Sequence, residues 1–232
     1  MPDSVQTVKS KINTLLFDAA GTLLFLTEAV GKSYSTVAKA HGLILDSVTV
    51  TQAFQKVWRS LPPRNTTNGP RPDDDRAWWR TLAEEVLIES GAKLEEFNTD
   101  AWFEELYTYF AQPGRWQAFP DVIPVLEKLR PQYRMAVVSN FDRRLYQVLE
   151  NTKLSGYFDA VFLSSELGVD KPDPKIFHLA MEKMNSNPDQ TLHVGDDALR
   201  DQQGARNAGL DVFLLDRPAI TLTHLLPLLC EG

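Results

Sequence analysis

Leu15-Leu16-Phe17-Asp18-Ala19-Ala20-Gly21-Thr22-Leu23 is the stretch of sequence that decides the fold of this chain. An apolar run ends abruptly at the carboxylate of Asp18, and small residues, a glycine and a threonine follow it. This order predicts a buried strand that delivers Asp18 to a tight turn at its carboxyl end. Because ligands of open α/β sheets bind in the crevice beyond the strand ends, Asp18 is a candidate functional residue.

Later apolar runs share the character of Leu15–Phe17, at Met135–Val138, Ala160–Leu163, Leu192–Val194 and Val212–Leu215. Each run is short and rich in β-branched or large apolar residues, as in strands that are buried on both faces. Helical patterns accompany them at Val122–Leu129, Arg143–Leu154, Pro174–Met184 and Leu199–Ala208, and Gly209 is expected to end the last one. This alternation predicts an α/β fold with a doubly wound, mostly parallel, five-stranded Rossmann-like core.

The segment 24–112 breaks this alternation, because it contains amphipathic helical patterns and no convincing strand. The expected helices are Glu28–His41, Val48–Leu61, Asp74–Ser90 and Thr99–Phe110. Between the second and the third lies Pro62–Pro72, a loop dense in proline, glycine and asparagine, and Asp73–Asp75 is expected to cap the third helix. We therefore predict a helical cap domain, residues 24–112, inserted into a core domain formed by residues 1–23 and 113–232.

The composition is ordinary for a soluble globular protein, with 43% hydrophobic residues among 232. The formal net charge of -7 argues against a nucleic-acid or anionic-membrane surface, because both need basic patches. No apolar run approaches the roughly 18 residues of a membrane span, and the polar start Met1–Lys11 lacks the apolar segment of a signal peptide. Cys230 is the only cysteine, so an internal disulfide is excluded and we expect a cytoplasmic protein.

Polar side chains follow the predicted strands at the points where these strands end. They are Asp18, Ser139, the lysine that opens Lys171–Pro174, and the acidic residues of Gly195-Asp196-Asp197 with Asp201. A parallel sheet gathers such groups along one edge. Carboxylates, a lysine and a hydroxyl on one edge suit a divalent cation and an anionic substrate, and Mg²⁺ commonly binds one or two carboxylates together with substrate phosphate oxygens.

In combination these motifs resemble those of the haloacid dehalogenase-like hydrolase superfamily, in its subclass with a helical cap. The motifs appear in order as Asp18-Ala19-Ala20-Gly21-Thr22, Val137-Val138-Ser139-Asn140, Lys171-Pro172, and Gly195-Asp196-Asp197 with Asp201. The resemblance spans essentially the whole chain, because the predicted cap occupies the interval where this subclass has its insertion. One such motif alone is a weak signal, whereas all of them in order are specific.

The resemblance implies that Asp18 is a nucleophile that attacks phosphorus and forms an aspartyl-phosphate. Ser139 would donate a hydrogen bond to a phosphoryl oxygen, and Lys171 would neutralise charge on both Asp18 and the substrate. The substrate would be a small phosphorylated or otherwise anionic molecule. The residues that would contact it in addition are Ala19, Ala20 and Asn140.

The same resemblance implies Mg²⁺ as the cofactor. The side chain of Asp18, the main-chain carbonyl of Ala20 and the side chain of Asp196 would hold the ion. Asp197 or Asp201 would support its water ligands, although Asp197 equally suits a helix cap.

Ala20 is the position where this chain departs from the phosphatases that it resembles. Those enzymes carry a second aspartate two residues after the nucleophile, which protonates the departing alkoxide and later activates water, typically worth about 10²–10⁴-fold. Alanine does neither, yet its backbone carbonyl is unchanged as a metal ligand. The sequence therefore predicts a site that binds Mg²⁺ and phosphate but is handicapped in turnover, unless the leaving group is good or a cap residue or water replaces the acid.

Two other interpretations stay open. The first is a hydrolysis of another kind. It could be dehalogenase-like, although a metal-free site gains nothing from concentrated carboxylates. It could also be phosphonatase-like, with a Schiff base on a cap lysine such as Lys32, Lys39 or Lys56. The second is a catalytically impaired protein that binds metal or phosphate or has a regulatory role. Ala20 is the residue that suggests this interpretation.

Several further side chains have both a functional and a purely structural interpretation. The aromatic candidates for a substrate pocket, for which packing inside the cap is the commoner role, are Trp58, Trp78 and Trp79. The basic candidates for contacting an anionic substrate, for which a solvated loop is the default, are Arg64, Arg71 and Arg76. His193 lies inside a strand pattern and is expected to pack in the core.

Overall fold

The computed structural model of the chain describes residues 11–230. The polar segment 1–10, on which the signal-peptide prediction rests, lies outside the described residues, as does the side chain of Cys230. Within residues 11–230, every helix is too short or too polar to traverse a bilayer.

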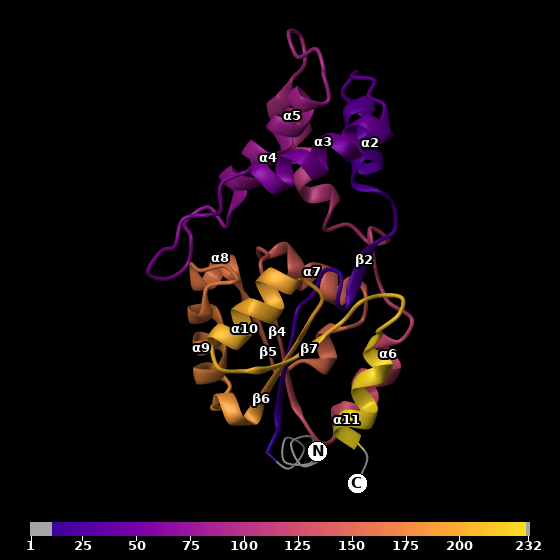
Figure 1. Cartoon of the computed structure of the whole chain (residues 1–232). Helices are drawn as coiled ribbons and strands as arrows, with labels where there is room; N and C mark the ends of the chain where they lie inside the picture. The colour runs from indigo at the N-terminus through magenta and orange to yellow at the C-terminus, as the bar shows by residue number, and fades with distance from the viewer. Residues whose placement is uncertain (1–10, 231–232) are drawn as a thin grey trace.

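A parallel five-stranded sheet, in the order β5-β4-β1-β6-β7, forms the centre of the lower layer in Figure 1. Its strands are β1 (Thr14–Phe17), β4 (Arg134–Ser139), β5 (Ala160–Leu163), β6 (Thr191–Gly195) and β7 (Asp211–Leu214). Each predicted apolar run forms one of them, so the predicted α/β core is confirmed. β1 lies in the middle, with Phe17 opposite Val137 of β4 and Val194 of β6, and it therefore carries Asp18 to the centre of the sheet edge.

Helices cover both faces of this sheet, because successive side chains of a strand point to opposite faces. Leu15 and Phe17 pack with α6 (Val122–Leu129) and α7 (Arg144–Asn151), whereas Leu16 packs with α9 (Pro174–Lys183) and α10 (Gly204–Asn207). The remaining elements of this layer are short: η1 (Ser155–Tyr157), α8 (Ser164–Leu167), η2 (Pro188–Gln190), η4 (Leu222–Leu225) and α11 (Leu226–Cys230).

The helix expected over Leu199–Ala208 is different in the structure. A π-helix, η3 (Ala198–Gln203), comes first and passes into the short α10, and Gly209 ends it in the left-handed region at φ +84°, as predicted. Wide turns of this kind occur often at functional sites. Here η3 carries Asp201 into the polar edge of the sheet.

The segment between β1 and α6 contributes a separate layer, visible at the top of Figure 1. Its helices, called the cap helices below, are α2 (Val30–Ala40), α3 (Ser47–Ser60), α4 (Arg76–Glu89) and α5 (Thr99–Tyr109), each within two residues of its predicted bounds. They have an apolar core of their own, built from residues such as Val50, Leu82 and Trp102.

The expectation of no strand in 24–112 is wrong. β2 (Leu24–Leu26) pairs antiparallel with β3 (Trp116–Ala118), placing Leu24 opposite Ala118. The two strands lie on the two connections between the sheet and the cap helices. With three residues each they are too short to show a period, and they form only because residues far apart in sequence meet.

The proline-rich loop and the acidic residues after it, residues 62–75, form a strap that lies on the core layer. Thr67 N donates to Gly168 O at 2.8 Å, and Arg71 N donates to Ser165 O at 2.7 Å. Asp74 accepts from the Ser165 hydroxyl at 2.6 Å. The strap therefore attaches the cap helices to the loop that precedes Lys171.

Charges inside the strap are buried, which corrects the expected roles of several residues. Arg71 pairs with Asp75 at 3.1 Å and with Asp170 at 3.1 Å, and Arg64 pairs with Asp75 at 3.1 Å. Neither arginine is solvated, since each side chain is 7% exposed. Asp73 caps α4 through the Ala77 N–H, as predicted. Asp75 makes no cap hydrogen bond and pairs with the arginines instead.

Candidate active site

Asp18 lies directly after β1 and is the centre of a buried polar cluster. Its Oδ1 accepts from Lys171 Nζ at 2.6 Å and from Ser139 Oγ at 3.3 Å. Ser139 is the last residue of β4, and Lys171 comes from the loop between α8 and α9. All three residues are buried, so the fold brings the predicted catalytic residues together in a site largely shielded from water.

Asn140 fixes the backbone of Lys171. Its amide donates to Lys171 O at 2.8 Å, and its Oδ1 accepts from Lys171 N at 2.7 Å. The predicted substrate contact therefore has its amide committed to positioning the lysine. Of the other two predicted contacts, Ala19 is fully buried and Ala20 is exposed.

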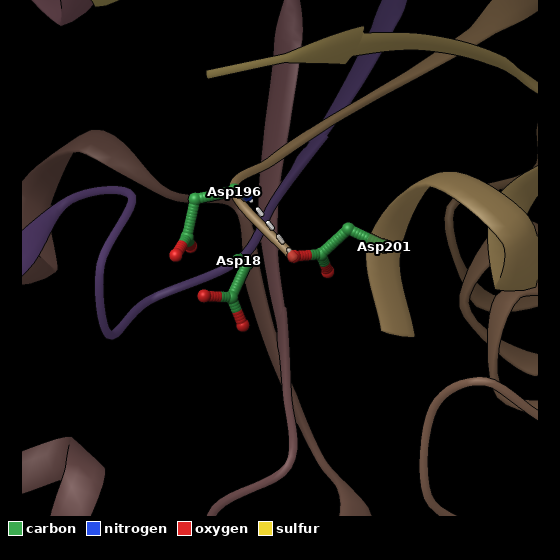
Figure 2. A group of neighbouring side chains, drawn as sticks. All are labelled: Asp18, Asp196 and Asp201. Carbon is green, nitrogen blue, oxygen red and sulfur yellow. Dashed lines mark hydrogen bonds between the residues drawn. The ribbon is translucent and has the colours of Figure 1, made fainter. Parts of the chain in front are cut away.

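Asp18, Asp196 and Asp201 form the acidic group in Figure 2. One side-chain oxygen of each lies within 4.8 Å of the others. Thr22 Oγ1 donates to Asp196 Oδ1 at 2.9 Å. Gly21 has φ +95°, and a Cβ there would lie 2.4 Å from Asp196 Oδ2, so only glycine permits this approach of the turn to the carboxylate.

Asp201 holds the cluster together. Its Oδ1 accepts from Lys171 at 2.6 Å and from the His193 ring at 2.9 Å, and its Oδ2 accepts from Asp196 N at 3.1 Å and Asp197 N at 3.0 Å. A carboxylate has about four acceptor sites, and all of them are used. Asp201 is thus a positioning residue that orients both the lysine and the loop carrying Asp196.

Asp197 has a local role in the structure. Its carboxylate accepts from the backbone N–H groups of Leu199 and Arg200 at 2.9 and 2.7 Å, and it pairs with the Arg200 guanidinium at 3.1 Å. These are the contacts of a helix cap at the start of η3. Its side chain is not one of the three that form the acidic group among the described residues.

Burial and charge set the protonation of the cluster. Burial raises the pKa of Asp18 to about 7, Lys171 opposes this rise, and Asp201 and Asp196 add to it. Burial disfavours the charged form of Lys171, but Asp18 and Asp201 outweigh it and raise its pKa. Burial also acts to raise the pKa of Asp201, but Lys171 and His193 outweigh it and hold that pKa well below its usual range. Lys171 is therefore a permanent cation between one fixed carboxylate and one that titrates near neutrality.

The donor set fits Mg²⁺. Three carboxylates and one ammonium group leave two uncompensated negative charges, which one divalent cation would neutralise. All the side-chain donors are oxygens, as Mg²⁺ prefers. The carbonyl of Ala20 accepts no backbone hydrogen bond from residues 11–230 outside regular elements, so it is available as a further oxygen ligand. Because the acceptor sites of Asp201 are used, Asp18 and Asp196 are the side chains best placed to hold the ion.

A cavity of about 300 Å³ lies between this acidic edge and the cap helices. Ala20 lines it beside Asp18 and Asp196. Of the three tryptophans proposed from the sequence, Trp58 and Trp79 line the cavity. The third, Trp78, packs edge-on against both, and its indole N–H donates to Pro62 O at 2.9 Å.

The fold and the order of the site residues are those of a haloacid dehalogenase-like hydrolase. The family model of that description matches residues 12–209, and the chain belongs to this family. A haloacid dehalogenase-like hydrolase domain-containing protein 3 from Bos taurus is 34% identical over 213 residues, which cover 90% of this chain and 83% of the bovine protein. The rhythmically expressed gene 2 protein of Drosophila melanogaster is 30% identical over 212 residues, which cover 86% of this chain and 81% of the fly protein.

Solved structures share the fold. The putative HAD-hydrolase YfnB from Bacillus subtilis, bound to magnesium, has a TM-score of 0.75 at 21% identity and covers 95% of this chain and 100% of its own. A HAD phosphatase from Thermococcus onnurineus has a TM-score of 0.64 at 23% identity, covering 93% and 97%. The L-2-haloacid dehalogenase from Xanthobacter autotrophicus has a TM-score of 0.66 at 24% identity, covering 89% and 78%. At these identities the likeness concerns the fold alone, and phosphatases and dehalogenases both have it.

Some contacts of the site are absent from the sequence prediction. His193 is buried in the core as expected, but its ring also bonds Asp201, and the aromatic ring of Phe177 packs against it at 4.9 Å. Thr22 bonds Asp196 across the turn. The position of Thr22 within the first motif could have indicated its contact with the site, whereas no local sequence pattern indicates the contact of His193 with Asp201.

Proposed function

We propose that this chain is a Mg²⁺-dependent phosphatase-type hydrolase that acts on a small phosphorylated molecule through an aspartyl-phosphate on Asp18. The observation that carries the proposal is the pair of donors on one oxygen of Asp18: Lys171 at 2.6 Å and Ser139 at 3.3 Å. An ammonium group and a hydroxyl beside an attacking carboxylate are suited to charge that develops on phosphoryl oxygens. The cap helices, within residues 24–112, would act as the cap that closes over the substrate.

Each residue has a role in this proposal. A carboxylate oxygen of Asp18 attacks phosphorus. The Lys171 ammonium group and the Ser139 hydroxyl orient the Asp18 carboxylate and stabilise charge on the phosphoryl oxygens. Asp18, Asp196 and the Ala20 carbonyl would hold Mg²⁺, which would supply positive charge against the phosphoryl oxygens. Asp201 orients Lys171 and does not react.

A phosphonatase-like reaction has less support. It needs a cap lysine at the substrate, but Lys32, Lys39 and Lys56 are exposed, and none is among the described residues that line the cavity. Lys56 pairs instead with Glu89 at 2.6 Å on the cap surface. The clustered carboxylates likewise argue against a metal-free, dehalogenase-like hydrolysis.

A second candidate is a binding or regulatory protein with the same metal and phosphate site. The observation that favours it is the absence of an acid that could replace the missing one at Ala20. Among the described residues that line the cavity, every carboxylate comes from the core layer and belongs to Asp18, Asp196, Asp197 or Asp201. The cap helices contribute none.

The test is a panel of phosphate esters with and without Mg²⁺, run on the full chain and on Asp18→Asn. We expect metal-dependent phosphate release that Asp18→Asn abolishes, together with a phosphate label on Asp18 after an acid quench. Asp189→Asn, an exposed aspartate far from the site, is the matched control and is expected to keep full activity. Mg²⁺ and phosphate binding without release or label would favour the binding protein.

A further inference from the structure

The walls of the cavity are aromatic, in contrast to its acidic floor. Buried rings of Tyr34, Phe103 and Tyr107 line it. The other rings that line it are Phe54, Trp58, Trp79, Phe110, Trp116 and Phe141. Most of these other rings come from the cap helices or the segments next to them, and all of them but Phe141 are partly exposed toward the space beside them. An apolar wall of this kind favours an apolar group on the ligand.

Three of these rings form a stack with nearly parallel planes, whose outer ring presents a flat face. Phe54 and Trp58 are stacked at 5.7 Å with an interplanar angle of 15°, and Trp58 and Trp79 at 6.0 Å with an angle of 27°. Aromatic pairs favour offset-stacked or edge-to-face contacts. A planar ring on the ligand fits such a face better than a puckered one.

The two arginines on the walls are already paired. Arg144 bonds Asp142 through Nε at 2.8 Å and Nη2 at 2.6 Å, and Arg200 pairs with Asp197 at 3.1 Å. The remaining polar groups of the walls are few: the hydroxyls of Tyr34 and Tyr107, and the buried indole N–H of Trp79, which has no acceptor among the described residues. A sugar or other polyhydroxylated group has more hydroxyls than these walls can pair, and each one left unpaired costs about 1–3 kcal/mol. A single acceptor atom on the ligand would satisfy the indole N–H.

The size of the cavity agrees with one ring. A cavity of about 150 Å³ holds benzene. The 300 Å³ here accommodates one aromatic ring together with a phosphoryl group above Asp18.

We infer that the substrate is an aryl phosphate, a phosphate monoester whose bridging oxygen is attached directly to an aromatic ring; this inference rests on the proposed phosphatase function. In the first step an oxygen of Asp18 bonds to phosphorus, the bond from phosphorus to the aryl oxygen breaks, and its electron pair leaves on the aryloxide. In the second step water bonds to phosphorus, the acyl–phosphate bond breaks, and inorganic phosphate leaves with the Asp18 carboxylate restored.

Such a leaving group removes the need for the acid that Ala20 lacks in the first step, whereas in the second step water still attacks without the help of a side chain at position 20. A phenol has a pKa of about 10, whereas aliphatic alcohols are close to water, at about 15.7. The aryloxide therefore departs as an anion and takes a proton from solvent afterwards. The aromatic wall and the alanine at position 20 thus point to the same substrate class.

The turnover experiment compares phenyl, benzyl and glycerol phosphates with the Mg²⁺-loaded full chain. Phenyl phosphate is expected to exceed benzyl phosphate in kcat/KM by about 100-fold or more, the size of a missing general acid. Ala20→Asp is expected to raise kcat/KM, which reports the first step, more for benzyl phosphate than for phenyl phosphate. A glycerol phosphate that is hydrolysed with a higher kcat/KM than phenyl phosphate would overturn the inference and leave the phosphatase function intact.

The binding experiment uses phenylphosphonate and methylphosphonate, which are not hydrolysed, and measures affinity by calorimetry. The phenyl compound is expected to bind more tightly, and Trp79→Leu is expected to weaken its binding about tenfold while leaving methylphosphonate unchanged. Trp78→Leu is the matched control, since this neighbouring ring does not line the cavity. Equal binding of the two phosphonates would overturn the inference. Selective phenyl binding in a chain that hydrolyses no ester would overturn the phosphatase function alone.

Discussion

Lys171→Met tests the electrostatic design of the site. Lys171 Nζ lies 2.6 Å from both Asp18 and Asp201, and its side chain is 2% exposed. Removing one partner of a buried ion pair costs about 3–5 kcal/mol. Methionine keeps most of the side-chain volume, so the loss of charge dominates. We expect the free energy of unfolding to fall by about 3 kcal/mol, because Asp18 can take up a proton and so reduce the cost of its unpaired charge.

The destabilisation caused by Lys171→Met should increase with pH. Burial raises the pKa of Asp18 to about 7 in the folded chain, above its value of 3.8 in model compounds. The contribution of such a group to stability is full at acidic pH and is lost as pH rises through about 7. Without the lysine the raised pKa rises further, so the destabilisation of Lys171→Met should be larger at pH about 8 than at about 6.

Thermal unfolding followed by circular dichroism measures this loss. For a chain of this length, about 3 kcal/mol lowers Tm by about 6–12 °C. Lys175→Met removes an exposed lysine from the start of α9 and is the matched control, expected to leave Tm unchanged. A Lys171→Met variant within about 1 kcal/mol of the parent at both pH values, the size of a surface ion pair, would refute the reasoning.

Three other perturbations have outcomes that follow from the contacts. Asp201→Asn leaves too few acceptors for its four donors, and we expect Mg²⁺ affinity, measured by calorimetry, to fall about 10–100-fold; an unchanged affinity would contradict its positioning role. Because the pKa of Asp18 is raised to about 7, Mg²⁺ binding should release close to one proton at pH about 6 and almost none at pH about 8, as calorimetry in buffers of different ionisation heat will show; equal release would mean that Asp18 is ionised throughout. Arg71→Met leaves Arg64 as the remaining guanidinium for Asp75 and Asp170 and should lower the free energy of unfolding in urea by up to about 3 kcal/mol, whereas the exposed Arg59→Met should not; equal effects would mean that the strap is not held by its charges.

The sequence predicted the parts of the fold that local pattern determines. The central strands β1, β4 and β6 are buried on both faces, so their apolar runs are continuous and easy to recognise. The cap helices have regular amphipathic periods and appear within two residues of the expected bounds. β2 has three residues and forms through a partner far along the chain, so no local pattern marks it.

Roles that depend on distant partners were beyond the sequence. Arg71 looks like a solvated loop arginine until the fold brings Asp170 to it. Asp201 was a candidate metal support, but Lys171 and His193 occupy its acceptors, and only the three-dimensional arrangement reveals that. The candidate catalytic residues could be singled out for the opposite reason, since each lies at the end of a recognisable strand or in a recognisable motif.

The strap gives the two layers of the molecule a thermodynamic linkage. Asp170 pairs with Arg71 of the strap, and the next residue, Lys171, bonds Asp18. If the two contacts are coupled, reciprocity demands that a ligand which tightens Lys171 onto Asp18 also tightens the strap by the same free energy. A double-mutant cycle of Arg71→Met and Lys171→Met measures that coupling, and additive losses would exclude it. With such coupling, ligand binding beside Asp18 and attachment of the strap to the core layer share one equilibrium through a single backbone junction.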